Sequence, residues 1–316
     1  MIQLKHIDDN AIEFIRDIIN HKQNKKEDKS IIEKRNECKR KNTPQPLDKV
    51  YKERCLETLT NNKSFIEAYD TDYNKDKWED IASGIPNAVN SKDDEEFQEL
   101  YSYSYSPIVK YRERLDRENN GRTASCPICE ASAANSLDHY IPQTEYPLYV
   151  VHPRNLIPCC TECNGHKNKK VIDNNKDRLY WNAFLDKQPT EQYLFCSVVR
   201  NTKGLPQCVY EIRQGHIDNK LWRIISKTFE DFELIKKYRI QAKNIVNKLR
   251  DKIITPVRDS GYSITKAIDQ EKVFYSSSST NINNWEYVTE KALLFSDIFK
   301  NTLVAELTRL GIKYTI

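Results

Sequence analysis

Two cysteine pairs have the spacing of a metal site. Each has the form Cys-x-x-Cys, Cys126 with Cys129 and Cys160 with Cys163, and the second pair begins 31 residues after the first ends. Four thiolates in two such pairs fill all the positions of a tetrahedral structural zinc site. The sequence therefore predicts bound zinc that holds this stretch together. Of the neighbouring Cys159 and Cys160, the spacing to Cys163 selects Cys160, and Cys159 is expected to pack beneath the pair.

An Asp-His pair lies between the cysteine pairs. Asp138 and His139 follow Leu137 and precede Pro142, which predicts a short strand that enters a proline-ended loop. Neighbouring residues of a strand point to opposite faces, so the two side chains must do different work. An imidazole with a pKa of about 6.5 can take a proton from water near neutral pH, and a carboxylate suits a hard cation. We therefore expect His139 to act as a base and Asp138 to hold a metal ion.

Side-chain amides follow this pair at regular places. The segment that starts at Cys163 is expected to begin a helix, in which positions four apart share a face. Asn164 and Asn168 would then point towards one site, whereas His166 would face the surface or a phosphate. Asn155 lies on the loop that returns to the second cysteine pair. Its amide can fix that loop and orient the imidazole, or it can be a plain turn residue.

Taken together, these elements resemble the HNH nucleases, the ββα-metal endonucleases, in their zinc-bearing form. The resemblance covers residues 125–170, about one seventh of the chain, and rests on the ordered set Asp138-His139-x-x-Pro142, Asn155 and Cys160-x-x-Cys163-Asn164-x-x-Lys167. It implies metal-dependent hydrolysis of a phosphodiester, with His139 as general base, Asp138 and Asn164 as ligands of the catalytic metal, and Asn155 as the central asparagine. The last motif position is Asn164 instead of a histidine, and such an oxygen donor set favours Mg²⁺ or Mn²⁺.

The same helix carries basic side chains. Lys167, Lys169 and Lys170, with Arg154 from the preceding loop, are expected to contact phosphates and to give binding that weakens with salt. Helical spacing adds Asn168 to the ligands of the catalytic metal. In the implied mechanism the base deprotonates a water aligned against phosphorus, while the cation neutralises developing charge and stabilises the leaving 3′ oxygen.

A narrower resemblance covers Leu137–Lys167 as a whole, the Asn155-Leu-Ile-Pro-Cys-Cys run and the aromatic hairpin that follows. This set looks like the HNH effectors of Septu-type anti-phage defence systems, including those linked to retrons, which work with an ATPase partner. It implies a nucleic acid as substrate, with DNA favoured, and an ATPase subunit as partner.

Two alternatives keep the same residues. A zinc-stabilised module could bind nucleic acid or protein without catalysis, with Asp138 and His139 as an incidental hydrogen-bonded couple. An RNA-cleaving HNH toxin would share the site and differ only in its substrate. The nuclease is favoured over the binding module because zinc binding alone needs neither the Asp-His pair nor Asn155 and Asn164.

Composition favours a soluble, helix-rich protein, with 30% charged residues, 38% hydrophobic residues and 18 tyrosines. No apolar run approaches the roughly 18 residues of a membrane span, and the first residues lack the basic and apolar regions of a signal peptide, so we expect a cytoplasmic protein without membrane partners. The remaining cysteines are then expected to be small buried residues or surface thiols rather than disulfides: Cys38, Cys55, Cys196 and Cys208.

Charge is unevenly distributed although the net charge is only +4. Residues 22–41 hold nine basic and four acidic side chains, whereas 67–99 hold eleven acidic and three basic. Such runs are most often solvated helix faces, and they can also mark a nucleic-acid-facing end and a protein-facing end. Between Tyr101 and Tyr105 three tyrosines alternate with serines, which suits either base stacking or an ordinary helix end or edge strand.

The elements that position this site are mainly helical. Apolar spacing and capping signals predict one helix after Asp8-Asp9-Asn10 and others near 30–41, 47–60, 63–70, 92–101 and 107–119. Residues 192–200 and 207–213 flank a Gly204-containing turn and predict a β-hairpin. One long helix or two abutting ones are expected over 219–253, closed by Pro256 and Gly261, then a polar loop at 276–283 and a final helix over 285–310.

We therefore predict an α+β chain that is predominantly helical, with a small zinc-bound ββα-metal core flanked by helical regions. The predicted boundaries are 1–119 for an N-terminal helical region, 120–185 for the nuclease core with its zinc site, and 186–316 for a β-hairpin with long helices.

Overall fold

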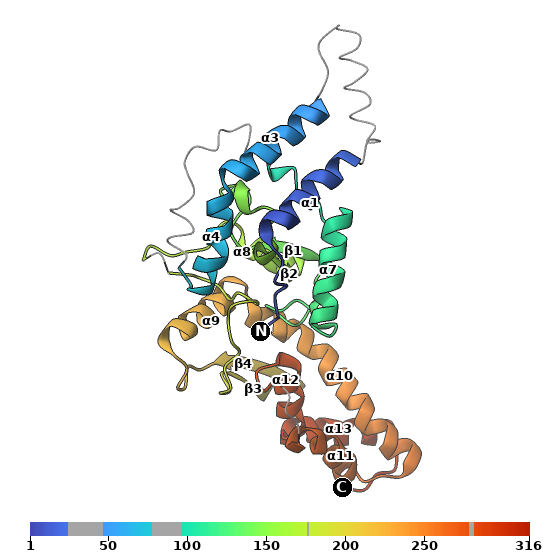
Figure 1. Ribbon diagram of the computed structural model, residues 1–316. Coiled ribbons are helices and arrows are strands. Elements are labelled where there is room, and N and C mark those ends of the chain that lie inside the picture. The colour runs from blue at the N-terminus through green and yellow to red at the C-terminus, as the bar shows by residue number, and fades with distance from the viewer. Residues whose placement is uncertain (25–46, 78–96, 176, 278–280) are drawn as a thin grey trace. The chain divides into compact units, whose positions relative to one another are not determined.

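The structure, a computed structural model, describes residues 1–24, 47–77, 97–175, 177–277 and 281–316. The chain is α+β, with about half of its residues in helices and two small antiparallel sheets (Figure 1), which confirms the predicted class. Contacts divide it into an N-terminal unit, Ile2–Ile128 with Ser132–Lys187, and a C-terminal unit, Met1 and Cys129–Ala131 with Gln188–Ile316. The three regions predicted from the sequence stay a prediction.

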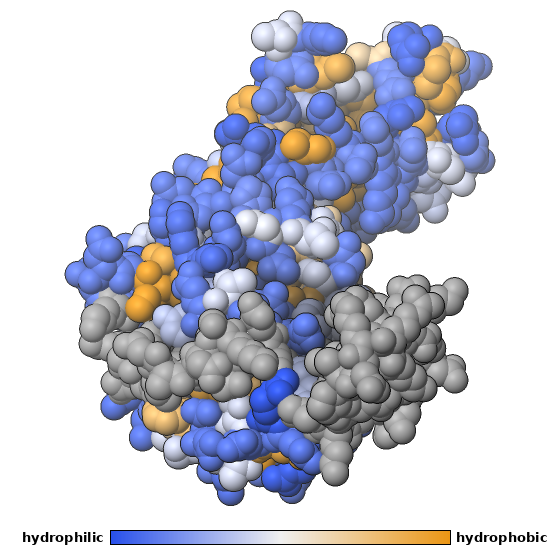
Figure 2. Space-filling view, turned by 90° about the horizontal axis from the view of Figure 1, so that it is seen from above, coloured by the Kyte–Doolittle hydropathy of each residue, from blue (hydrophilic) through white to orange (hydrophobic). Residues whose placement is uncertain are grey.

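The face of the molecule in Figure 2 is mainly polar, in keeping with the high content of charged residues. Figure 2 shows a face on which hydrophilic side chains predominate and hydrophobic ones form small separate groups. Over the described ranges of the chain, we find no helix that combines the length and the apolar character needed to cross a membrane.

The N-terminal unit contains the helices α1 (Ala11–Asn24), α3 (Leu47–Asn61), α4 (Lys63–Asn74) and α7 (Ser106–Glu118). Helix α1 starts where the sequence signal predicts, since the side chain of Asn10 accepts a hydrogen bond from the Glu13 amide at 3.1 Å. Its apolar side chains are buried at helical spacing, at Ile12, Ile15, Ile18 and Ile19. Helices α3, α4 and α7 confirm the helices expected near 47–60, 63–70 and 107–119. The one expected over 30–41, and the first half of the one over 92–101, fall outside the described residues.

The centre of this unit is a two-stranded sheet followed by a short helix. Strand β1 (Ser136–His139) pairs antiparallel with β2 (Leu156–Cys159), so that Asp138 lies opposite Ile157. Helix α8 (Thr161–Lys167) begins directly after β2 and packs on β1. The order along the chain is strand, strand, helix, and it brings the Asp-His pair and the second cysteine pair to neighbouring elements (Figure 1).

The C-terminal unit is built on a β-hairpin. Strands β3 (Leu194–Arg200) and β4 (Pro206–Ile212) form the predicted antiparallel hairpin, and the Asn201 side chain accepts a hydrogen bond from the Leu205 amide across the turn at 3.0 Å. Helix α12 (Trp285–Leu294) packs on β3, and α10 (Leu234–Ser260) packs on β4 and α12. The Tyr238 and Trp285 rings stack at 5.5 Å within this core.

Three details of this unit differ from the sequence prediction. The long helical region is two helices, α9 (Asn219–Asp231) and α10, which is one of the two predicted alternatives, and α10 is followed by Gly261 in a left-handed conformation, as predicted; Pro256, however, lies inside α10 and does not end it. Proline removes only one helical hydrogen bond here, and the packed turn after it continues. Helix α11 (Ile264–Ser277) was not predicted. The final helix is divided into α12 and α13 (Asp297–Arg309), because the Ser296 side chain caps a new helix at the Phe299 amide.

Candidate metal centre and active site

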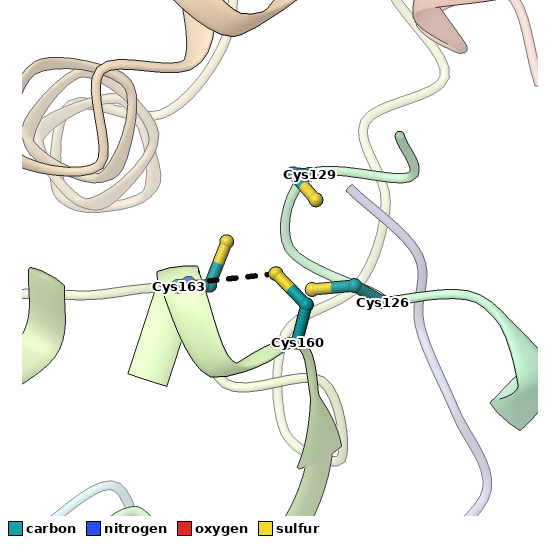
Figure 3. Close-up of side chains that lie close together, drawn as sticks. All are labelled: Cys126, Cys129, Cys160 and Cys163. Atoms are coloured by element: carbon teal, nitrogen blue, oxygen red, sulfur yellow. Dashed lines mark hydrogen bonds between the residues drawn. The ribbon is translucent and has the colours of Figure 1, made fainter. Parts of the chain in front are cut away.

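The four cysteines of the two pairs come together, as predicted. The ligand atoms of Cys126, Cys129, Cys160 and Cys163 all lie within 4.8 Å of one another, and all four residues are buried. Figure 3 shows their sulfur atoms facing a common point. Tetrahedral zinc with Zn–S bonds of about 2.3 Å needs sulfur atoms about 3.8 Å apart, so only small inward shifts are required. The cluster can therefore bind a metal ion such as zinc.

Helix α8 begins at this cluster. Cys160 is its N-cap, and the thiol sulfur accepts a hydrogen bond from the Cys163 amide at 3.4 Å. The neighbouring Cys159 is fully buried outside the cluster, with its sulfur 3.3 Å from the Ser136 hydroxyl oxygen. Burial raises the pKa of the Cys159 thiol, which keeps it protonated and unsuited to metal binding.

Asp138 forms a buried ion pair that the sequence did not predict. Its side chain is joined to the ammonium of Lys167, from the last turn of α8, at 3.0 Å, and Lys167 also donates to the His139 carbonyl at 2.9 Å. The two residues are only 4% and 1% exposed. Burial raises the pKa of Asp138, and the neighbouring ammonium opposes this rise. The pair compensates both charges and fastens α8 to β1.

His139 has different neighbours, as alternation along a strand requires. Its ring meets the Tyr101 ring edge-on, with centroids 4.4 Å apart and planes at 80°. The Nε2 atom is buried and has no hydrogen-bond partner within the described parts of the chain. Burial lowers the pKa of His139 to about 4, while a hydrogen bond with the Val150 backbone acts in the opposite direction. The ring is therefore neutral near pH 7, with a lone pair that can accept a proton.

Asn155 fixes the loop between the strands. Its amide is fully buried: the oxygen accepts from the Ile141 amide at 2.7 Å and the Tyr69 hydroxyl at 3.2 Å. The nitrogen donates to the carbonyls of Ile141 and Tyr149, at 3.1 and 2.9 Å. This loop includes Val150, which bonds the His139 ring. Asn155 can thus act on the imidazole through the loop, and these hydrogen bonds do not include one to the ring itself.

The two asparagines of the helix are placed differently from each other. Helix α8 ends at Lys167, and Asn168 turns away with φ 51° and ψ −130°. Asn tolerates positive φ better than most residues. Because the helix ends before Asn168, Asn164 and Asn168 do not share one helix face as positions four apart would. Asn164 is half-buried on the helix and Asn168 is exposed beyond it.

The basic residues expected at phosphates fall into two groups. Lys167 is held on Asp138, and the Arg154 guanidinium bonds Asp70 and Asp8 at 3.1 Å each and Asn74 at 2.6 Å. Lys169 and Lys170 are exposed, and His166 is half-buried. Only the exposed lysines present their charge to solvent in this arrangement, so the phosphate contacts stay a prediction.

Side chains of the described residues do not by themselves complete the site expected for a second, catalytic metal ion. In the described part of the chain, the cysteine cluster is the single group of three or more His, Cys, Asp or Glu side chains that can hold a metal ion. Mg²⁺ needs fewer protein ligands, because it keeps several waters and binds through one or two carboxylates together with substrate phosphates. Asp138 and Asn164 are oxygen donors of the type that this ion prefers.

Similarity to known proteins is low. No family model matches the chain, and no solved structure matches it. Protein ea31 of Escherichia phage lambda is 23% identical over 188 residues, which are 55% of this chain and 62% of that protein. Septu protein PtuB of Bacillus thuringiensis is 23% identical over 198 residues, which are 60% of this chain and 74% of PtuB. The match therefore covers less than two thirds of the length of the phage protein.

Proposed function

We propose that this protein is a metal-dependent endonuclease of the HNH type, which hydrolyses phosphodiester bonds of nucleic acid, with DNA the favoured substrate. The observation that carries the proposal is the Nε2 atom of His139, which belongs to a neutral ring and has no hydrogen-bond partner among the described residues. It lies on a strand next to a carboxylate, in a strand-strand-helix element that begins at a four-cysteine cluster. His152 also has a buried Nε2 atom without a partner among the described residues and a lowered pKa, so what favours the nuclease is the position of His139 beside Asp138 on β1.

In this mechanism His139 takes a proton from the attacking water, and Asn155 holds the loop that bonds the imidazole. Asp138 and Asn164, with Asn168 as a third candidate, would hold Mg²⁺ or Mn²⁺, which supplies neutralising charge for the transition state. Lys167 keeps the Asp138 carboxylate in place on β1. The cysteine cluster has a structural role only, since four sulfur ligands leave no open position on zinc.

Similarity to Septu protein PtuB supports a link to an anti-phage defence system. We propose that the protein is the nuclease effector of a cytoplasmic defence complex, in which an ATPase subunit is the partner implied by the resemblance of the central motif. Purification of the protein from its host, followed by mass spectrometry of the associated chains, tests this part. A preparation that contains no second protein would contradict it.

The catalytic proposal is tested by incubating the purified protein with supercoiled plasmid, single-stranded DNA and RNA, each with Mg²⁺, Mn²⁺ or EDTA. His139→Ala should lower the rate about 10²- to 10⁴-fold, the usual contribution of a general base. His216→Ala, which changes an exposed histidine of the C-terminal unit, is the matched control and should leave the rate unchanged. Cleavage that persists in EDTA or in His139→Ala would refute the assignment.

One observation favours a second candidate, a zinc-stabilised binding module. The Lys167 ammonium already neutralises Asp138, which is what a purely structural carboxylate would require. Asp138→Asn separates the two functions. If this variant still binds nucleic acid but no longer cleaves it, the nuclease is supported. If the unchanged protein binds nucleic acid without cleaving it, the binding module is supported. Cleavage of RNA but not DNA would identify the third alternative, an RNA-cleaving enzyme.

A further inference from the structure

The base in the proposed mechanism is covered. A general base must come within hydrogen-bond reach of the water from which it takes a proton. His139 is only 9% exposed, and its Nε2 atom is buried without a partner in the described part of the chain. Some side chain must therefore move before this atom can meet a water and a phosphate.

Tyr101 is the aromatic side chain that packs against the His139 ring among the described residues. Its ring lies against the imidazole at 4.4 Å and 80°. The segment that carries it is fixed on the far side, because the Tyr103 ring holds the Arg112 guanidinium at 3.7 Å and the Tyr105 amide bonds the Ser102 carbonyl at 3.0 Å. Tyr101 therefore lies at the end of an anchored segment, with its own ring over His139.

The way Tyr101 is held differs from that of other tyrosines in the same unit. Four of them fix their hydroxyl groups by hydrogen bonds at 2.6 to 3.2 Å, namely Tyr69, Tyr73, Tyr111 and Tyr140. For Tyr101 no hydroxyl hydrogen bond is found with any described residue, and the side chain is half-buried. As far as the described residues show, packing keeps the ring in place, so a rotation about its side-chain torsions breaks no hydrogen bond with them.

We propose that Tyr101 is a positioning residue that gates His139: its ring covers the imidazole in the resting protein and turns aside when a nucleic-acid strand brings its phosphate to the site. This inference rests on the proposed nuclease function. It gives a role to the alternating Tyr-Ser segment that neither the zinc cluster nor the Asp-His pair explains.

The test is carbethoxylation of histidines by diethyl pyrocarbonate near neutral pH, with rates for each residue from peptide mass spectrometry. The chain contains its own references, because His152 is fully buried and His216 is exposed. In the unchanged protein His139 should react like His152. In Tyr101→Ala its rate should rise at least about tenfold towards that of His216, which corresponds to removal of roughly 1.4 kcal/mol of opening free energy.

Two variants serve as controls. Tyr101→Phe keeps the ring and should keep His139 protected, and Tyr262→Ala, which changes a half-buried tyrosine of the C-terminal unit, should also leave the rate unchanged. Equal rates for His139 and His216 in the unchanged protein would overturn the proposal, as would continued protection in Tyr101→Ala. The same increase in Tyr262→Ala would show general loosening and would also overturn it.

Hydrolysis of bis(p-nitrophenyl) phosphate separates the gate from the nuclease. This small phosphodiester has no strand with which to displace the ring, so Tyr101→Ala should hydrolyse it several-fold faster, with a smaller change for plasmid. An unchanged rate would overturn the gate. If the unchanged protein cleaves no nucleic acid while the labelling pattern holds, the nuclease proposal fails and Tyr101 is a cover of a non-catalytic histidine.

Discussion

The buried pair of Lys167 and Asp138 allows the sharpest test of how the centre is held together. Lys167→Met keeps the length of the side chain and removes its charge. It eliminates the 3.0 Å contact with Asp138 and the 2.9 Å hydrogen bond to the His139 carbonyl. Lys167 and Asp138 are only 1% and 4% exposed, so water cannot solvate the Asp138 carboxylate that remains unpaired in the variant.

Removing one partner of such a pair costs about 3 to 5 kcal/mol of unfolding free energy. In a unit of this size that corresponds to a melting temperature lower by roughly 6 to 20 °C. The assay is urea and thermal unfolding followed by circular dichroism in the presence of zinc. Lys169→Met, which removes an exposed lysine of the same segment, should change the unfolding free energy by less than about 0.5 kcal/mol.

The pH dependence gives an independent check on the cause. In Lys167→Met the pKa of the folded Asp138 should rise further above its unfolded value, because the opposing ammonium is gone. The native state then binds the proton more tightly than the unfolded chain, so the variant regains stability as pH falls towards the unfolded pKa of about 3.9. A loss below about 1 kcal/mol, or a loss that does not shrink at low pH, would refute this reasoning. The double variant with Asp138→Asn should recover most of the loss.

Three further predictions concern the same unit. Cys160→Ser should lose the bound zinc, measured by atomic emission, together with cooperative unfolding, since structural zinc contributes about 10 to 16 kcal/mol in zinc-finger peptides; Cys159→Ser should retain the metal, and equal loss in both would contradict the ligand assignment. Burial, with Arg154 nearby, lowers the pKa of His152 to about 3. The unfolded chain then binds the proton more tightly, so stability is lost as pH falls below about 6.5, by about 2 kcal/mol between pH 7.5 and pH 5 for this group alone. In urea unfolding at both pH values, the free energy of unfolding of His152→Gln should therefore fall less between pH 7.5 and pH 5 than that of the unchanged protein, and an equal fall in both would argue against this role. Asn155→Ala removes four hydrogen bonds from a fully buried amide and should cost about 3 kcal/mol or more in the same assay, whereas a loss under about 1 kcal/mol would mean that the loop does not depend on it.

The local parts of the site were predictable because their spacing alone fixes the geometry. A Cys-x-x-Cys pair brings two thiols to one metal whatever surrounds them, and the strand before Pro142 places Asp138 and His139 on opposite faces. The β-hairpin around Gly204 follows from alternation and turn chemistry in the same way. In each case the determining residues lie within a few positions of one another.

Partners that depend on distant packing could not be read from the sequence. Arg154 was expected at a phosphate, yet its guanidinium bonds Asp70 and Asp8, residues that are 84 and 146 positions away. Lys167 was likewise expected to contact a phosphate, but the contact of α8 with β1 buries it. The division between α12 and α13 did have a local signal, since Ser296 followed by Asp297 is a typical helix start.

Helix α8 has only seven residues, a length of about 10 Å at 1.5 Å per residue. Its first turn contains Cys163 and its last residue is the lysine that bonds both Asp138 and the His139 backbone. Oxidation of the cysteines or removal of their metal by a chelator would release the N-terminal end of α8. The His139 imidazole would then lose its alignment although it had not itself reacted. Hydrogen exchange along β1 should accordingly speed up when zinc is withdrawn, which makes the redox and metal status of the cell an input to the strand that carries the proposed base.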